Sequence, residues 1–423
     1  MERPGHAGRA EEAMMNQRGE ANSVPGGGLA DGEAHHSGQF ASAMARGAGR
    51  EVADAGWLSA EPATCWPALW RQARGIGQVV TGDAAQLNFA ENVLRARDDD
   101  EVLVFWGEAR VQNRYDHGEL YRAVAHFAAG LREQGIGPGH RILASLPNLP
   151  EAVVAMLAAA SVGAVFAAIP ADMDADAARA RVAAWSPHLI VASDGYEVAG
   201  ERVDTLPRAA EWAAALPELK RVVLVPYVHG TDDPRQVRHG RLLAEFVAPF
   251  LKVTEIRFQR QACDAPALLV GDASPGAGQK MSVQSAGELL LWGLKTLCYD
   301  ADLGPSDRLV CALPVGSAGW CRITAAPAAG ASLLLYAGVP VVGGDSLLLD
   351  FIAVERATHV ALDAQVLEAL AKGVPGARDL SPLRVILSPV TLDTRRVAAV
   401  FGREVPVVTI DPAAPLAATV LAG

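Results

Sequence analysis

The chain has 423 residues, half of them hydrophobic and 20% charged, so it can bury a large core and is long enough for two or three domains. Its net charge of −11 argues against a nucleic-acid polymer as a partner, because binding to the phosphate backbone needs a cationic surface. Five cysteines without a CxxC pair argue against a disulfide scaffold and against structural zinc, and they favour a reducing, cytoplasmic location.

The first part of the chain predicts neither a secretory signal nor a membrane span. Residues 1–56 are rich in Gly, Ala, Met and Glu without apolar periodicity, so we expect a disordered leader there. Residues 152–169 carry no charge, and their length alone would suggest a membrane-spanning helix. Because Pro150 and Pro170 bracket this stretch and Gly163 interrupts it, we expect instead a helix that ends at Gly163 and a short buried strand.

One helix is specified at both ends and is predicted over residues 116–134. Asp116 and Glu119 have the spacing of a capping box, and Gly135 stands at the position after a helix where glycine is favoured. Apolar residues recur on one face at helical spacing: Leu120, Val124, Phe127 and Leu131.

Strands and helices then alternate. Strands are expected over residues 141–146, 164–169, 188–192 and 221–225, and helices over residues 151–162, 174–185 and 208–216. The strands are continuous apolar runs, as in parallel sheets covered on both faces. Such alternation predicts a doubly wound sheet.

A charged stretch at residues 230–241 is expected to be an exposed loop, and a second series follows it. Its strands are expected over residues 267–270, 308–312, 331–336, 384–387 and 405–410, and its helices over residues 286–297, 346–356, 364–372 and 394–401. The predicted fold class is therefore α/β, with doubly wound subdomains over residues 57–250 and 251–423. No internal repeat of fixed period is visible.

Six stretches carry a family resemblance: LNFAENVL (87–94), LPNLPEAVVAMLAAASVGAVF (146–166), DGYEVAG (194–200), VVLVPY (222–227), GASLLLYAGVP (330–340) and LSPLRVILS (380–388). They resemble the adenylate-forming acyl-CoA synthetases, and within them the acetoacetyl-CoA synthetase branch. The similarity runs from about residue 57 to about residue 388 and is denser in its first half.

The resemblance implies the large N-terminal domain of such an enzyme. These enzymes make an acyl-adenylate from ATP and a carboxylate and then transfer the acyl group to CoA. The implied ligands are ATP with Mg²⁺ and a short carboxylate such as acetoacetate. The family's C-terminal domain and its catalytic lysine have no counterpart in the sequence. We therefore expect that domain to be absent, assign no catalytic residue and no metal ligand, and do not expect CoA to bind.

The family's phosphate loop, roughly Y-S-S-G-T-T-G-L-P-K, has its counterpart at residues 271–280, GDASPGAGQK, after a predicted strand. Only Lys280 matches, and the resemblance makes it the candidate phosphate ligand. Ser274 and the backbone amides around Gly276 and Gly278 are the other candidates for nucleotide binding. The alternative is a Gly-rich turn between a strand and a helix, with a solvated Lys280.

Two changes in this loop oppose phosphate binding. Pro275 and Gly276 replace the two consecutive threonines of the family, and Pro275 lacks the backbone N–H that could bind phosphate. Asp272 adds a negative charge; at about 4 Å and an effective dielectric near 20, its repulsion of a phosphate is about 4 kcal/mol unless Mg²⁺ offsets it.

The family's acyl-pocket stretch, T-T-C-G-W-M-M-W-N, corresponds to residues 313–321. Trp320 keeps the position of a family tryptophan, and Gly316 falls at the family glycine. Both are candidates for a substrate pocket; a core tryptophan is the alternative interpretation of Trp320.

Three functions remain open. The favoured one is a catalytically impaired homologue that retains nucleotide or acyl binding. The second is an active acyl-CoA ligase with divergent motifs. The third is an interaction protein or the remnant of a truncated gene, in which an exposed apolar face at the truncation would drive self-association.

Overall fold

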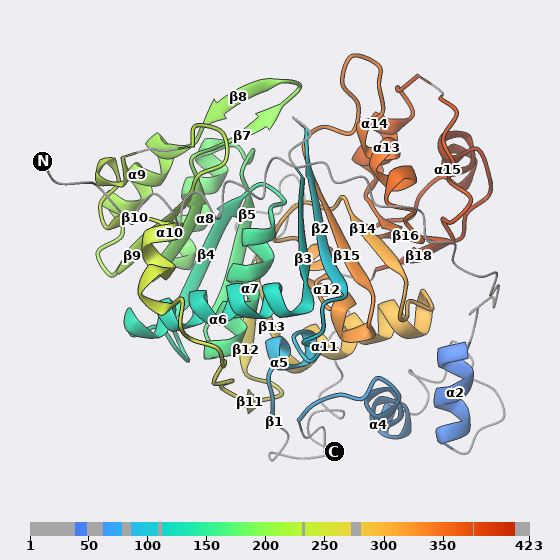
Figure 1. The fold of residues 1–423 in the computed structure, drawn as a ribbon, viewed down its shortest axis with the longest axis horizontal. Coiled ribbons are helices and arrows are strands. Elements are labelled where there is room, and N and C mark those ends of the chain that lie inside the picture. Colours follow the sequence, from blue (N-terminus) through green and yellow to red (C-terminus); the bar gives the residue numbers. More distant parts are fainter. Residues whose placement is uncertain are drawn as a thin grey trace, which may run out of the picture.

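The computed structural model describes residues 39–48, 62–77, 86–108, 112–230, 233–271, 281–374 and 376–410. Within them, two seven-stranded sheets lie side by side with helices between and outside them (Figure 1). The expected α/β class is confirmed.

The first sheet has the strand order β10-β9-β6-β4-β5-β12-β13, and only its last pair is antiparallel. Its strands are β4 (Arg141–Leu146), β5 (Val165–Pro170), β6 (Leu189–Ser193), β9 (Arg221–Val225), β10 (Gly240–Leu242), β12 (Pro266–Gly271) and β13 (Met281–Ser285). The helices α6 (His117–Glu133) and α7 (Pro150–Val162) pack on its inner face, and α8 (Ala175–Trp185) and α9 (Leu206–Ala215) pack on its outer face.

The second sheet has the order β18-β17-β16-β14-β15-β2-β3, and again only the last pair is antiparallel. Its strands are β2 (Glu101–Gly107), β3 (Gln112–Asp116), β14 (Arg308–Cys311), β15 (Ser332–Ala337), β16 (His359–Ala361), β17 (Val385–Ser388) and β18 (Val407–Thr409). Its inner helices are α11 (Ala286–Leu294) and α12 (Ala318–Ile323), and its outer helices are α13 (Leu347–Val354), α14 (Ala364–Leu370) and α15 (Thr394–Phe401).

Residues along each strand alternate between two hydrophobic cores. In β4, Ile142 and Ala144 join the central core between the sheets, whereas Leu143 joins the core under α8 and α9. In β14, Leu309 joins the central core and Val310 joins the core under α13 to α15. The fold therefore has five layers, helix–sheet–helix–sheet–helix, which explains the continuous apolar runs.

The two central helices follow their sequence signals. Asp116 caps α6 and forms the predicted capping box with Glu119, and Gly135 has a φ of +64°. Helix α7 is buried on nearly all sides and ends at Gly163, whose φ is +76°. The charge-free stretch is thus a core helix and a strand, and no helix in the described part of the chain is long and apolar enough to cross a membrane.

Smaller elements complete the structure. They are α2 (Gln39–Gly47), α4 (Pro62–Gln72), α5 (Phe89–Val93) and α10 (Leu243–Val247), the short pair β1 (Gln86–Leu87) with β11 (Gln261–Ala262), the hairpin β7 (Gly195–Val198) with β8 (Glu201–Asp204), the 3₁₀ turns Pro234–Gln236, Ala248–Phe250 and Ala326–Ala329, and a π-helical turn at Lys295–Asp300. The expected loop at residues 230–241 therefore contains a 3₁₀ turn and runs into the edge strand β10.

Two expectations differ from the structure. Residues 39–47, within the expected disordered leader, form α2, where Met44 and Ala45 are buried because they pack into the central core. The expected division at residue 250 does not coincide with the sheets, since β2 and β3 belong to the second sheet and β12 and β13 to the first. The two pairs of strands thus belong to the sheet of the other half of the chain. This results from pairing between strands far apart in the sequence, which local sequence patterns do not predict.

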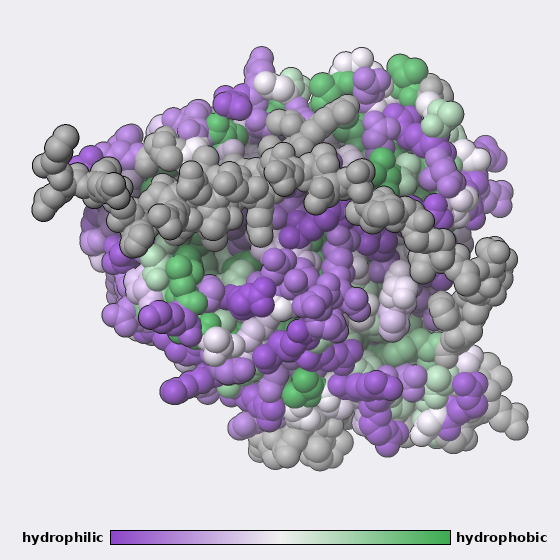
Figure 2. All heavy atoms as spheres, in the orientation of Figure 1, coloured by the Kyte–Doolittle hydropathy of each residue, from purple (hydrophilic) through white to green (hydrophobic). Residues whose placement is uncertain are grey.

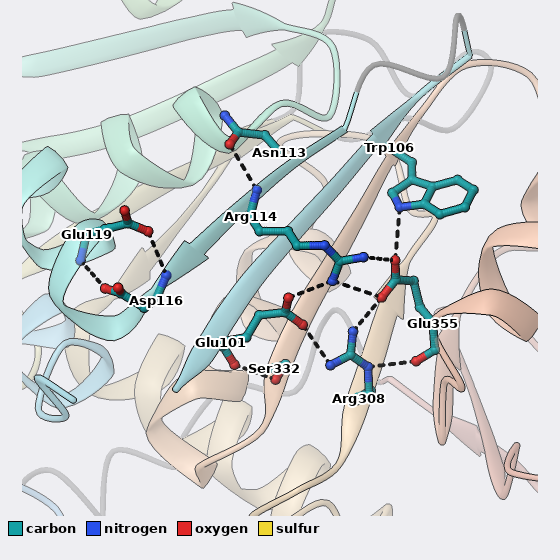
Figure 3. Close-up of polar contacts among 9 residues, drawn as sticks. All are labelled: Glu101, Trp106, Asn113, Arg114, Asp116, Glu119, Arg308, Ser332 and Glu355. Atoms are coloured by element: carbon teal, nitrogen blue, oxygen red, sulfur yellow. Dashed lines mark hydrogen bonds and ion pairs between the residues drawn. The ribbon is translucent and has the colours of Figure 1, made fainter. Parts of the chain in front are cut away.

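An ion-pair network holds the β2–β3 hairpin in the second sheet (Figure 3). Glu101 accepts hydrogen bonds from Arg114 Nη1 at 2.6 Å and from Arg308 Nη1 at 2.8 Å. Glu355, which follows α13 and whose side chain is 4% exposed, accepts from Arg308 Nη2 at 2.6 Å and from the indole N–H of Trp106 at 3.0 Å. Two carboxylates and two guanidinium groups thus balance each other's charge across four segments of the chain.

Candidate functional site

Both sheets contain a point where the chain reverses its direction of winding. After β4 the chain passes through α7 on the inner face to β5, and after β5 it passes through α8 on the outer face to β6, beyond β4. The second sheet repeats this path from β14 through α12 to β15, and through α13 to β16. Open α/β sheets bind ligands at the carboxyl ends of strands at such points, so the β4/β5 and β14/β15 crevices are the candidate sites.

The loop after β4 enters the crevice of the second sheet. Asn148 donates hydrogen bonds from Nδ2 to the carbonyl oxygen of Cys311 in β14, at 2.9 Å, and to that of Tyr336 in β15, at 3.3 Å. Its Oδ1 accepts the indole N–H of Trp320 at 2.9 Å. The amide of Asn148 is therefore occupied by protein groups on both its oxygen and its nitrogen.

The loop after β14 enters the crevice of the first sheet in return. Gly316 has a φ of +83°, and a Cβ at this position would lie 2.2 Å from the carbonyl oxygen of Ala168 in β5. Only glycine fits a loop that touches the neighbouring backbone so closely. We call the contact region of residues 146–149 and 312–317 with the ends of β4, β5, β14 and β15 the junction.

Trp320 packs beneath the junction. Its side chain is fully buried, with 0% exposure, and its backbone N–H donates to the hydroxyl of Ser317, which caps α12. In this conformation Trp320 is a core side chain. A pocket role for Trp320 and Gly316 stays a prediction, and for Trp320 it requires the indole to leave its hydrogen bond to Asn148.

The candidate phosphate loop lies between two paired strands. Lys280, Ser274, Gly276 and Gly278 fall within residues 272–280, outside the described residues. On either side of them β12 and β13 are antiparallel neighbours, with Gly271 opposite Met281. The loop therefore joins two strands rather than a strand and a helix; α11 begins only after Ser285.

A positively charged side chain, that of Arg181, lies beside the start of this loop. An ideal Cβ on Gly271 would be 3.1 Å from Cζ of Arg181, on α8. Because Gly271 is the last described residue before the loop, the guanidinium group brings positive charge to the carboxyl end of β12. An anion bound here would be attracted by it.

Asp194, directly after β6, organises the same edge of the first sheet. It is 2% exposed, and its carboxylate accepts four consecutive backbone N–H groups, at distances of 2.8 to 3.3 Å, from Tyr227, Val228, His229 and Gly230. These bonds solvate the buried charge and fix the loop after β9. Asp194 therefore has a structural role at this edge.

The resemblance stretch at residues 87–94 is also structural. Asn88 donates to the carbonyl oxygens of Ala160 at 2.7 Å and Gln259 at 2.9 Å, and it caps α5. Asn92 exchanges two hydrogen bonds with the backbone of Ile76. The motif thus joins the amino-terminal segment to the end of α7.

The cysteine at the junction is not a reactive thiol. Burial raises the pKa of the Cys311 thiol to about 12, so it carries no thiolate at neutral pH. No group of three or more His, Cys, Asp or Glu residues among those the structure describes could hold a metal ion.

Sequence reasoning overlooked Asn148 and Asp194, although both lie within the resemblance stretches. Each stands two residues after a predicted strand, and that position was the available signal. Their partners lie far along the chain, so the contacts themselves could not be anticipated.

The comparisons with known proteins agree with this architecture. The AMP-binding enzyme family profile matches residues 89–268. The acetoacetyl-coenzyme A synthetase of Rhizobium meliloti (strain 1021) is 33% identical over 352 residues, which is 78% of this chain and 53% of that protein. The acetoacetyl-CoA synthetase of Rattus norvegicus is 30% identical over 71% of this chain and 45% of its own length.

A solved structure extends the similarity to the fold. The acetoacetyl-CoA synthetase from Streptomyces lividans superposes with a TM-score of 0.78 at 27% identity, covering 88% of this chain and 62% of that one. The chain spans about half the length of the curated relatives named here. By sequence and by fold, the chain is similar to the adenylate-forming acyl-CoA synthetases, and within them to the acetoacetyl-CoA synthetases.

Proposed function

We propose that this chain is a catalytically impaired homologue of acetoacetyl-CoA synthetase that retains weak binding of a nucleotide or a short acyl carboxylate. The observation that carries this proposal is the sequence of residues 271–280, where Pro275 and Gly276 stand in place of two threonines. Their hydroxyls and one backbone N–H are the groups that would contact phosphate and Mg²⁺ in the family. Their loss removes interactions that favour the triphosphate.

The surroundings of this loop support residual anion binding. Arg181 lies beside Gly271, and Lys280 adds a second positive charge. Within the loop, the charges of Asp272 and Lys280 cancel. Arg181 brings the net charge of the three side chains to +1, which favours a phosphate more than the loop's own net charge of zero does. ATP with Mg²⁺ would supply the activated phosphate when bound; Lys280, Arg181 and the loop amides would hold its anionic end.

The junction supports a restricted acyl site. Trp320 and Asn148 are buried and bonded to each other, so an acyl group would have to displace the indole or stay outside it. A small carboxylate such as acetoacetate is the acyl class with the least volume to accommodate.

Titration calorimetry of the full chain with Mg-ATP, with and without acetoacetate, tests this proposal. We expect sub-millimolar to millimolar binding that Lys280→Ala weakens by at least about tenfold. Lys252→Ala is the matched control, because Lys252 is exposed and lies outside the loop. It should bind as the unchanged chain does.

Each remaining outcome selects another function. Pyrophosphate release that depends on acetoacetate would make the chain an active ligase and end the impaired-homologue proposal. A folded sample that binds neither ligand would leave an interaction protein or a gene remnant. Self-association stays a prediction, which light scattering measures directly.

The described surface offers no ready apolar face on the side drawn in Figure 2. Hydrophilic side chains dominate it, and hydrophobic ones appear in small separate groups. The exposed large hydrophobic residues are scattered over different elements: Leu251, Val283, Val354, Val374 and Val390. Because the exposed apolar residues do not form one face, ligand binding is a better-supported proposal than docking of a protein partner.

A further inference from the structure

The β7–β8 hairpin reaches from one sheet to the other. It follows β6 of the first sheet and lies at the top of Figure 1. Its tip contacts Glu108, the residue after β2 of the second sheet. Glu108 Oε1 accepts the N–H of Gly200 at 2.5 Å, and Oε2 accepts the N–H of Val339, after β15, at 2.9 Å. One carboxylate therefore joins the hairpin tip to the carboxyl edge of the second sheet.

The hairpin is firmly fixed at its base. A Cβ on Gly195 would lie 2.4 Å from the carbonyl oxygen of Val203 and from a methyl group of Val228, so the chain is tightly packed there. The N–H of Thr205 also donates to the carbonyl oxygen of Asp194 at 3.0 Å. The base therefore cannot shift without disturbing the first sheet.

The tip has much weaker support. The two strands form a sheet of their own, and β8 is largely exposed. An isolated two-stranded hairpin is marginally stable in water, so its position depends on its anchors. Ala199 and Gly200 both have positive φ, +50° and +82°, which turns the tip toward Glu108.

Glu108 is suited to the role of that anchor. It is 9% exposed, and the backbone passes close to it at Gly338, where a Cβ would lie 2.6 Å from Cβ of Glu108. Both of its oxygens act as acceptors. A glutamine has only one acceptor oxygen, and its NH₂ group would face a second N–H donor.

We propose that the β7–β8 hairpin is a strap across the carboxyl edges of the two sheets and that Glu108 is the latch that controls its opening. An open strap would expose the ends of β2 and β15 beside the junction. The role in ligand entry rests on the proposed function, whereas the latch itself can be tested without any ligand.

Amide hydrogen exchange of the full-length Glu108→Gln variant tests the latch. We expect exchange at Gly200 and Val339 to rise together by at least about tenfold, while the strands of both sheets keep their protection. Trypsin should also cleave after Arg202 faster. Glu201→Gln is the matched control for amide exchange, because it makes the same charge change on the exposed strand of the same hairpin. It should leave the exchange rates of Gly200 and Val339 unchanged.

The other outcomes overturn the proposal. Unchanged exchange at Gly200 in Glu108→Gln would mean that the carboxylate does not hold the tip. A rise throughout both sheets would mean that Glu108 supports the whole fold. A rise in Glu201→Gln as large as in Glu108→Gln would mean that any lost charge loosens the hairpin.

Ligand kinetics separate the strap from the proposed function. If the chain binds Mg-ATP, the association rate of Mg-ATP should rise in Glu108→Gln and stay unchanged in Glu201→Gln. An unchanged rate in both variants would show that the strap does not gate this ligand and would overturn its role in ligand entry. If the unchanged chain binds no nucleotide, the proposed function fails, and the exchange experiment alone decides the latch.

Discussion

The two sheets of this molecule follow one plan. Their strand orders correspond position by position, from β10 and β18 at one edge to the antiparallel strands β13 and β3 at the other. A Leu-Pro pair stands where β4 ends, at residues 146–147, and another follows β14, at residues 313–314. The internal symmetry lies in the order of elements, and no repeat of fixed period in the sequence reveals it.

Each half of the chain lends a hairpin to the other sheet. The hairpins β2–β3 and β12–β13 both lead into an inner helix through a capping box, Asp116 with Glu119 and Ser285 with Glu288. The halves are therefore interlocked, since neither sheet is complete without strands from the other half. We infer that the two sheets unfold together rather than as separate units.

The halves differ mainly at the carboxyl edge. The first sheet inserts β7–β8 between β6 and α9, whereas in the second sheet α14 follows β16 closely, with Asp363 as its cap. The hairpin loop at residues 272–280 is also longer than its counterpart after β2. A shared scaffold with different loops at the ligand edge is how open α/β sheets diverge in function.

The largest effect is expected from breaking the contact between the two crevices. Gly316→Val would place a side chain on the carbonyl oxygen of Ala168 and strain a positive φ, so we expect a loss of about 3–4 kcal/mol in the free energy of unfolding. Denaturant titration measures it. Gly343→Ala, with a φ of +59° and free space around it, should lose only about 1–2 kcal/mol.

Two results would contradict this prediction. Equal losses in the two variants would show that backbone strain alone matters and that the loop does not press on β5. A stable Gly316→Val protein would mean that the loop can move away from the first sheet.

Asn148→Leu removes the reciprocal contact, from the first half into the second. It leaves two carbonyl oxygens and the indole N–H of Trp320 without their partner. Unsatisfied buried groups cost about 1–3 kcal/mol each, and partial relaxation should hold the loss to about 3 kcal/mol. Unfolding followed by tryptophan fluorescence measures both the stability and the environment of Trp320. If the loss stays below that of Gly343→Ala, the amide of Asn148 does not join the halves.

The ion-pair network gives a smaller effect, specific to the second sheet. Arg308→Met removes the bond to Glu101, one bond to Glu355 and a bond to the carbonyl of residue 355, so we expect a loss of about 2 kcal/mol. Arg114→Met should lose less, because the Arg114 side chain is 46% exposed. A double-mutant cycle in urea measures the coupling. Additive losses would show that the two arginines act independently and that no network exists.

Local sequence signals were sufficient for the helices with caps and for the long apolar strands. Helix α6 and strands β4 and β9 appear at or within one residue of the predicted bounds, because their signals are local. Strand β16 is only three residues long, and α12 lies in a stretch rich in Gly and Pro, so neither has a pattern of its own.

The candidate site was harder to predict. Its approximate place followed from the resemblance at residues 271–280 and 313–321. The bond between Asn148 and Trp320 joins residues 172 positions apart, and the contact of Glu108 with Gly200 spans 92. A single sequence carries no signal for such pairs, since the residues meet only through the order of strands in space.

The smallest expected effect is on pH dependence at the amino-terminal edge of the first sheet. His188 accepts the N–H of Arg141 at 3.1 Å and stacks edge-on against His140, whose Nε2 lies 3.2 Å from Nζ of Lys220. Burial, with the positive charge of Arg141 adding to it, lowers the pKa of His188 below its usual 6.5. The folded protein therefore favours neutral His188.

The sign of the effect follows from proton linkage. Below about pH 6.5 the unfolded chain binds a proton at His188 more readily than the folded chain does. The free energy of unfolding therefore decreases as the pH falls below that value. Thermal unfolding at about pH 7.5 and about pH 5.5 should show a smaller drop for His188→Gln than for the unchanged chain. His126 and His359, whose pKa values burial also lowers, keep part of the drop in the variant. An identical drop in both proteins would mean that His188 protonates as easily in the folded state as in the unfolded one. The amino-terminal edge of the first sheet would then contribute nothing through His188 to the pH dependence of stability.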